Sequence, residues 1–246
     1  MFIYQIKIEY LGTKFVGWQI QKNGLSVQEV IQKILSKYLK EKISLIGSGR
    51  TDAGVHALEQ SAHFKTKREI LKKNIFINST NFFLSKYPIR ILNIKKKAKN
   101  FHARHSAVER TYKYLIVNRE ASLAIEKNKA WHVKKELDIN IMKKGAKILQ
   151  GNNDFSTFRS SSCGAKSPIK TLKKASIKKS NKKIIFTFVS KSFLQHQVRS
   201  MVGSLKYLGE GKWSLRDFKK AFLSKKRSLC APPAPAYGLY LHKVEY

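Results

Sequence analysis

The spacing of apolar residues near the start of the chain predicts a strand followed by a helix. From Tyr4 to Tyr10 every second residue is apolar, and polar residues stand between them. This period of two indicates a half-buried strand. Residues 27–38 carry apolar side chains at helical spacing instead, which is typical of an amphipathic helix. Ser26 followed by Glu29 matches a capping box, so we expect the helix to begin directly after Ser26.

The rest of the chain predicts further strands and helices in two comparable series. The first half adds strands at 43–50 and 57–66, a helix at 72–83 and a strand at 89–97. The second series begins with a strand at 110–118 and a helix at 141–151 and closes with a strand at 238–246. Between that helix and the closing strand we expect a hairpin at 169–193, which turns near Ser180 and Asn181, and helices at 197–211 and 215–227. The pattern predicts an α+β fold with halves at 1–105 and 106–246 and no sequence repeat.

The net charge is the most unusual feature of the composition. Lys and Arg total 50 against 15 acidic residues, a formal net charge of +35. Such a field attracts polyanions, of which nucleic acid is the usual one. Lysine, isoleucine and asparagine are all abundant, however. A genome biased towards A and T would enrich these residues in any protein, and the added lysines would raise the charge without any role in binding. Charge alone therefore leaves both explanations open.

Cysteine content and hydropathy bear on the compartment. The two cysteines form no disulfide or zinc pattern, the first residues do not match a signal peptide, and no apolar run is long enough for a membrane span. We expect a cytoplasmic protein without a membrane segment.

A glycine-rich loop, GSGRTDAGVHA at residues 47–57, holds the most distinctive chemistry. Arg50 next to Asp52 would keep the carboxylate ionised, and an ionised, positioned Asp serves as nucleophile or general base. The same spacing also fits a structural ion pair that holds the loop. A metal site of Asp52, His56 and His63 is a further alternative, although their spacing is not a tight ligand pattern.

This loop, GRTDAGVHA, resembles the signature of the TruA-type tRNA pseudouridine synthases. Five further segments resemble that family in its own order: YLGTKFVGWQIQ with SVQEVI, FHARHSAVERTYKYLI, GNNDFSTF, FLQHQVRSMVGSL and PPAPAYGLYL. The resemblance implies an isomerase without a cofactor that converts uridine to pseudouridine at positions 38, 39 and 40 of the tRNA anticodon stem-loop. It also implies two α+β halves forming a continuous mixed, mainly antiparallel sheet with a central cleft, and a homodimer.

The resemblance also assigns site residues. Asp52 matches the catalytic aspartate, which either adds covalently to the sugar or acts as a base at its 2′ carbon; the sequence leaves both routes open. Arg50 matches an arginine that reaches towards the flipped-out nucleotide, and Arg199 matches the basic partner of the aspartate. Tyr112 matches an active-site tyrosine that can stack on uracil, and Leu239 an apolar residue against the target base. Taken alone, Tyr112 and Leu239 would be core residues, and Arg199 a solvated helix charge.

Some positions depart from the family pattern. Ile20 stands where a basic residue is common, Ser200 replaces a frequent Asn, and residues 77–90 match only loosely. These departures concern RNA contacts and local packing. The rival from another class is a basic, non-catalytic RNA-binding protein, and a metal-dependent nuclease using Asp52 and His56 is the third alternative. An Asp beside two arginines favours the enzyme, since a binder of a polyanion has no need of a buried carboxylate.

Overall fold

The computed structural model describes all residues, 1–246. Its contacts divide the chain into two units. Unit 1 comprises Met1–Val108 and Tyr240–Tyr246, and unit 2 comprises Glu109–Leu239. The predicted second half, 106–246, included the closing strand, whereas residues 240–246 of that strand belong to unit 1.

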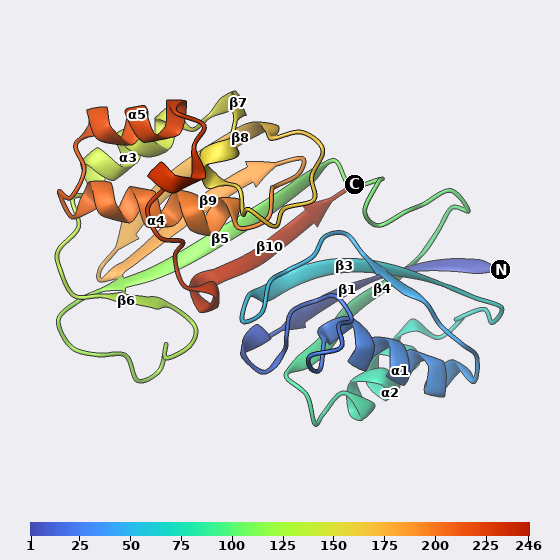
Figure 1. Ribbon diagram of the computed structural model, residues 1–246. Helices are drawn as coiled ribbons and strands as arrows, with labels where there is room; N and C mark the ends of the chain where they lie inside the picture. Colours follow the sequence, from blue (N-terminus) through green and yellow to red (C-terminus); the bar gives the residue numbers. More distant parts are fainter. The chain divides into compact units, whose positions relative to one another are not determined.

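Unit 1 is built on the strands β1 (Phe2–Tyr10), β2 (Leu45–Gly47), β3 (His56–Thr66) and β4 (Ile89–Lys97). β1 pairs antiparallel with both β3 and β4, and β2 pairs antiparallel with β3. The C-terminal strand β10 (Leu239–Glu245) runs parallel to β3, with Tyr240 opposite His56. Two helices, α1 (Val27–Leu39) and α2 (Lys73–Phe83), lie together beside these strands (Figure 1).

The predicted strand and helix at the start of the chain are confirmed. The apolar residues from Tyr4 to Tyr10 are all buried, because a pleated strand turns alternate side chains to one face. The Ser26 hydroxyl accepts a hydrogen bond from the Glu29 N–H at 3.2 Å, so Ser26 caps α1 as expected. Val27, Ile31 and Leu35 bury the apolar stripe of that helix.

Unit 2 contains β5 (Glu109–Asn118), β6 (Trp131–Val133), β7 (Gly151–Asp154), β8 (Ile169–Ser180) and β9 (Lys183–Ser190). β9 lies antiparallel between β5 and β8, β7 extends the sheet beyond β8, and β6 runs parallel to β5. The helices α3 (Ile139–Ile148), α4 (Gln197–Gly209) and α5 (Leu215–Leu223) contact one another and lie together beside this sheet (Figure 1). Ten strands, mostly antiparallel, and five α-helices confirm the predicted α+β class.

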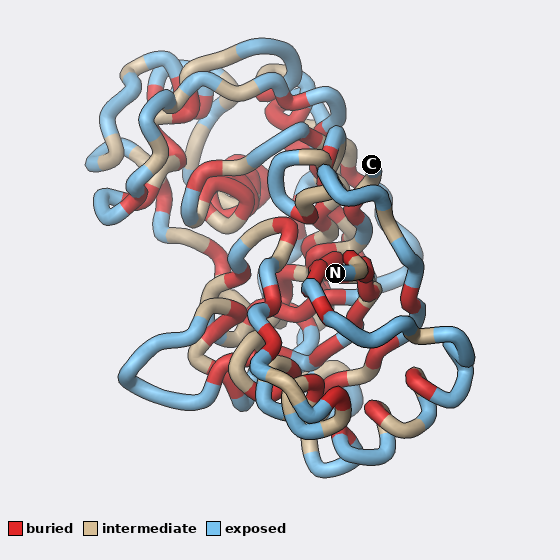
Figure 2. The backbone as a smooth tube through the Cα atoms, turned by 90° about the vertical axis from the view of Figure 1, so that its right-hand side faces the viewer, coloured by how far each residue is buried: buried red, intermediate tan, exposed pale blue.

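Several element boundaries differ from the predictions. The expected strand at 43–50 is only Leu45–Gly47, and two short strands, β6 and β7, were not predicted. α3 ends at Ile148, three residues before Gly151, which adopts a φ of 99° and begins β7. Buried residues follow the inner sides of the elements and exposed residues form the outer loops (Figure 2). None of the helices combines the length and the apolar character that crossing a lipid bilayer requires.

Candidate active site

The glycine-rich loop is anchored at its start to the neighbouring strand β3. The Ser48 N–H donates to the Ser61 carbonyl at 2.7 Å, and the Ser48 hydroxyl donates to Oε1 of Gln60 at 2.7 Å. The Gln60 amide in turn donates to the Gly49 carbonyl at 3.0 Å. Ser48, Gln60 and Ser61 are all buried, so water does not compete for these hydrogen bonds. The bonds therefore fix the backbone that leads to Arg50 and Asp52.

The middle of the loop is held at Thr51, the residue directly before Asp52. The Thr51 hydroxyl lies 2.9 Å from the phenol oxygen of Tyr10, and both side chains are buried. The Trp18 N–H donates to the Thr51 carbonyl at 3.0 Å. Gly17 adopts a φ of 113°, and a Cβ atom there would lie 2.6 Å from that carbonyl oxygen. Only glycine therefore permits this close approach.

The end of the loop is held by a turn and by a buried histidine. The Val55 N–H donates to the Asp52 carbonyl at 3.1 Å, and Gly54 supplies the positive φ of 78° inside that turn. The ring of His56 accepts the Gly12 N–H on Nδ1 at 2.9 Å. A Cβ atom on Gly12 would lie 2.0 Å from the Val55 carbonyl oxygen, so this contact also requires glycine.

Asp52 therefore stands between two anchored stretches of backbone in unit 1. Its side chain is half-buried, whereas Arg50, two residues earlier, is exposed. A carboxylate on a fixed backbone with part of its surface open can meet a ligand without a rearrangement of the loop. Arg50 projects a flexible cation from the same loop, which suits contact with an anionic ligand.

Tyr112 and Tyr114 extend from the same face of β5 in unit 2. Tyr112 is buried, stands opposite Phe188 of β9, and meets the Phe193 ring edge-on at 5.1 Å between centroids. The Tyr114 phenol donates to the Pro235 carbonyl at 2.8 Å. Burial raises the pKa of Tyr114 well above its usual value, which keeps this hydroxyl a hydrogen-bond donor throughout the physiological range.

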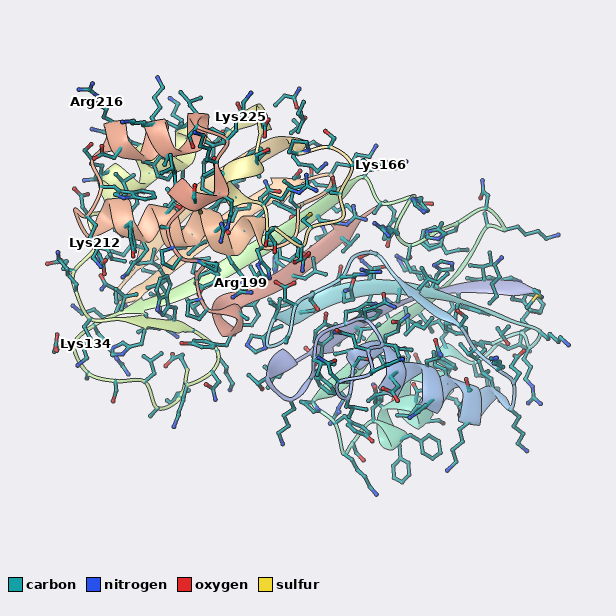
Figure 3. All side chains as sticks on the ribbon, in the orientation of Figure 1. Lys134, Lys166, Arg199, Lys212, Arg216 and Lys225 are labelled. Carbon is teal, nitrogen blue, oxygen red and sulfur yellow. The ribbon has the colours of Figure 1, made fainter.

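Arg199 lies in the first turn of α4 and is tied to the segment before β10 (Figure 3). Its Nε donates to the Ala234 carbonyl at 2.8 Å, and the Ala234 N–H donates back to the Arg199 carbonyl at 2.9 Å. The side chain is half-buried. The Nε bond directs the guanidinium group and the backbone bond joins α4 to residue 234, so Arg199 is not the freely solvated helix charge that its sequence position alone would suggest.

Leu239 is buried at the first position of β10, directly after the short turn Ala236–Gly238. The five predicted site residues thus fall on both units. Arg50 and Asp52 share one loop of unit 1, and Tyr112, Arg199 and Leu239 belong to unit 2. Within unit 2, Tyr114 and Arg199 both hold the 234–235 backbone that leads to Leu239.

The metal alternative finds no support in the geometry of its histidines. His56 and His63 are both buried in β3, and each uses Nδ1 to accept a backbone N–H, from Gly12 and Ala103 respectively. Burial also lowers the pKa of His63 to about 4. No group of three or more His, Cys, Asp or Glu side chains is placed to hold a metal ion.

Sequence patterns alone did not assign a role to the residues that support the loop. Tyr10 was predicted only as part of a strand face, and Thr51 and Trp18 received no role. Only their positions in the sequence could have pointed to this supporting role. Tyr10 and Trp18 are the first and last residues of the segment YLGTKFVGW, and Thr51 lies inside the loop itself.

One family model and several named proteins match this chain, and their descriptions agree with one another. A family model described as tRNA pseudouridine synthase matches residues 6–111 and 146–246. A protein named tRNA pseudouridine synthase A from Pelagibacter ubique is 60% identical over 246 residues, covering 100% of both chains. Proteins of the same name from Parvibaculum lavamentivorans and Methylocella silvestris are each 43% identical over 243 residues, covering 99% of this chain and 98% of theirs.

Proposed function

The chain belongs to the tRNA pseudouridine synthase family, and on that premise we propose that it isomerises uridine to pseudouridine in the anticodon stem-loop of tRNA, at positions 38, 39 and 40. The observation that carries the proposal is the half-buried Asp52 on a loop anchored before, at and after it. A protein that only binds RNA has no use for a carboxylate presented in this way, because it repels phosphate.

The reaction exchanges one bond to the sugar for another and needs no external electron acceptor. The bond between C1′ and N1 of uracil breaks, the base turns, C1′ joins C5, and the proton on C5 leaves as N1 gains one. Asp52 assists either by adding to C1′ or by removing a proton from the 2′ carbon. Both routes need a carboxylate in a fixed position, and the anchored loop around Asp52 supports this requirement.

The other site residues are proposed to bind the substrate nucleotide. Arg50 is exposed and long enough to follow a nucleotide that has left the helical stack. The ring of Tyr112 meets the Phe193 ring edge-on and is proposed to stack on uracil. Arg199, held by Ala234, supplies a fixed cation, and Leu239 an apolar contact. No cofactor is part of the proposal, because uracil leaves as a delocalised anion.

The remaining surface is suited to the tRNA backbone. The side chains of Lys134, Lys166, Lys212, Arg216 and Lys225 all extend outward from unit 2 (Figure 3) and are exposed. Phosphate contacts of this kind supply affinity without reading sequence. The tRNA stem would be recognised mainly by its shape. We further propose that the protein acts in the cytoplasm, where its two free cysteines stay reduced, and as a homodimer.

The test is to map pseudouridine in tRNA transcripts that have been incubated with the pure protein. The proposal expects new pseudouridine at positions 38–40 of a transcript that carries uridine there. A matched transcript with cytidine at these positions should gain none. Tight binding of both transcripts with no pseudouridine in either would instead identify a non-catalytic RNA-binding protein. Pseudouridine at other positions would retain the enzyme class and refute the anticodon stem-loop as its target.

A further inference from the structure

The segment PPAPAYG, residues 232–238, leads to β10 and is called the proline strap below. Its first four residues belong to no helix or strand, and a short turn follows at Ala236–Gly238. Three of the seven residues are prolines, which have no N–H group to donate and favour extended backbone in the residue before them. Since most donors are missing from the first part of the strap, the rest of unit 2 can hold it there mainly through its carbonyl oxygens.

Helix α4 holds the strap at two of these carbonyls. The Pro232 carbonyl oxygen lies against Gly203, where a Cβ atom would be only 2.0 Å away. The Ala234 carbonyl accepts the hydrogen bond from Nε of Arg199 at 2.8 Å. The direction of the Arg199 guanidinium group therefore depends on where the strap places the Ala234 carbonyl.

Tyr114 of β5 holds the next carbonyl along the strap. Its phenol donates to the Pro235 carbonyl at 2.8 Å, and the side chain is fully buried, at 0% exposure. The strap also packs closely on the ring, because a Cβ atom on Gly238 would lie 2.5 Å from the nearest ring carbon. Tyr114 therefore contacts the strap both before and at the end of its turn.

The bonds from Tyr114 and Arg199 act on neighbouring residues of one short stretch of backbone. Successive carbonyls of an extended chain point in different directions, so the two side chains hold residues 234 and 235 from different sides. Without the phenol, the Pro235 carbonyl would lose its donor in a largely buried place and would move to find another. That movement would carry the adjacent Ala234 carbonyl with it and change the direction of Arg199.

We propose that Tyr114 is a positioning residue for the isomerisation of uridine, because its phenol fixes the proline strap and the strap aims the guanidinium group of Arg199. The proposal rests on the proposed function and adds to it a residue outside the five predicted site residues. Tyr114 acts through Arg199 and, being fully buried, makes no contact with the substrate.

The first test compares Tyr114→Phe with the matched control Tyr4→Phe. Tyr4 is 1% exposed and lies in unit 1, and its phenol oxygen accepts the Ile70 N–H at 2.8 Å. Each substitution removes one buried phenol oxygen and its bond to the backbone, so both should lower the urea midpoint of unfolding by similar amounts. Only Tyr114→Phe should lower kcat for tritium release from C5-labelled uridine in tRNA, by about tenfold, with KM within about twofold of wild type.

A double variant tests whether Tyr114 acts through Arg199. Arg199→Lys keeps the positive charge but has no Nε donor for the Ala234 carbonyl. In the Arg199→Lys background, Tyr114→Phe should lower kcat by only about twofold, because the strap no longer aims the cation. An equal loss in both backgrounds would overturn the proposal. So would a loss of kcat in Tyr4→Phe as large as in Tyr114→Phe, which would assign the effect to general destabilisation.

Amide hydrogen exchange tests the strap without any use of catalysis. In Tyr114→Phe the amides of residues 234–239 should exchange about tenfold faster than in wild type, because the strap opens more often. Tyr4→Phe should leave this exchange unchanged. Unchanged exchange in Tyr114→Phe would overturn the proposal, and so would faster exchange with kcat at the wild-type value. A failure of the proposed activity would show separately, as a wild-type protein that releases no tritium.

Discussion

The hydrogen bond between Tyr10 and Thr51 is expected to hold Asp52 in place, and the substitution Tyr10→Phe removes it while keeping the ring. The two oxygens are 2.9 Å apart, and the residues are 3% and 6% exposed. Thr51 is the immediate neighbour of Asp52, and its carbonyl is held separately by the Trp18 N–H. The substitution therefore loosens one of two anchors at this point of the loop.

The expected cost follows from burial. A buried hydrogen bond contributes about 0.5–1.5 kcal/mol, and a buried hydroxyl left without a partner costs about 1–3 kcal/mol. We expect Tyr10→Phe and Thr51→Val each to lower the free energy of unfolding by about 1–2 kcal/mol. The double variant should lose less than the sum, with a coupling of about 1 kcal/mol, because it removes both ends of one bond.

Activity should respond as well. A small displacement of a catalytic group can cost up to about a hundredfold in rate, and with one anchor retained we expect kcat to fall by about tenfold. The KM for tRNA should stay near the wild-type value, since we expect the affinity to come from phosphate contacts elsewhere.

Urea unfolding and the release of tritium from C5-labelled uridine in tRNA measure the two effects. Tyr38→Phe is the matched control, because it makes the same chemical change on α1, where the Tyr38 ring packs edge-on against Phe76. If Tyr10→Phe is as active as Tyr38→Phe, and its coupling to Thr51→Val is zero, then the hydrogen bond does not position the loop.

Three further predictions concern the metal, the charge and the pH dependence. Pseudouridine formation in prefolded tRNA should persist in excess EDTA, and a loss that a divalent ion restores, with tRNA folding shown intact, would contradict the metal-free mechanism. Binding of tRNA should weaken with salt at a log–log slope of about −4 to −5 if about five phosphates are neutralised, whereas a slope near zero would mean that the charge of +35 is compositional drift. His63 has its pKa lowered to about 4 by burial, so the unfolded chain takes up a proton there that the folded chain does not. Stability should therefore fall as pH decreases from about 7 to 4, and His63→Gln should reduce that slope by up to about 1.4 kcal/mol per pH unit in urea titrations; an unchanged slope would contradict this assignment.

Elements with a long regular period could be predicted from the sequence because local spacing decides which side they bury. The strand from Phe2 and the helix after Ser26 are examples, and the latter also has a local cap. The strands β6 and β7 could not be predicted in this way. Each has only three or four residues and exists because distant partners, β5 and β8, supply its hydrogen bonds.

The candidate site shows the same limit. Asp52 and Arg50 are conspicuous in the sequence because glycines surround them. The need for Gly17, however, comes from the Thr51 carbonyl, 34 positions later, and the direction of Arg199 comes from Ala234. No local pattern contains either contact. Residue types that create charge can be found in a sequence, whereas the contacts that aim them depend on the folded chain.

The substitution Asp52→Asn tests the central claim most directly. It keeps the size and polarity of the side chain but removes the carboxylate that we propose to act as nucleophile or base. Asp138→Asn is the matched control, because it makes the same change of charge at the cap of α3, where Asn serves as well as Asp. Tritium release from C5-labelled uridine and filter binding of tRNA would be measured on both variants, with folding checked by circular dichroism. The account predicts no release by Asp52→Asn, normal release by Asp138→Asn, and tRNA binding by both at or slightly above the wild-type level. Full release by a correctly folded Asp52→Asn would contradict it, and would show that this carboxylate only supports the loop.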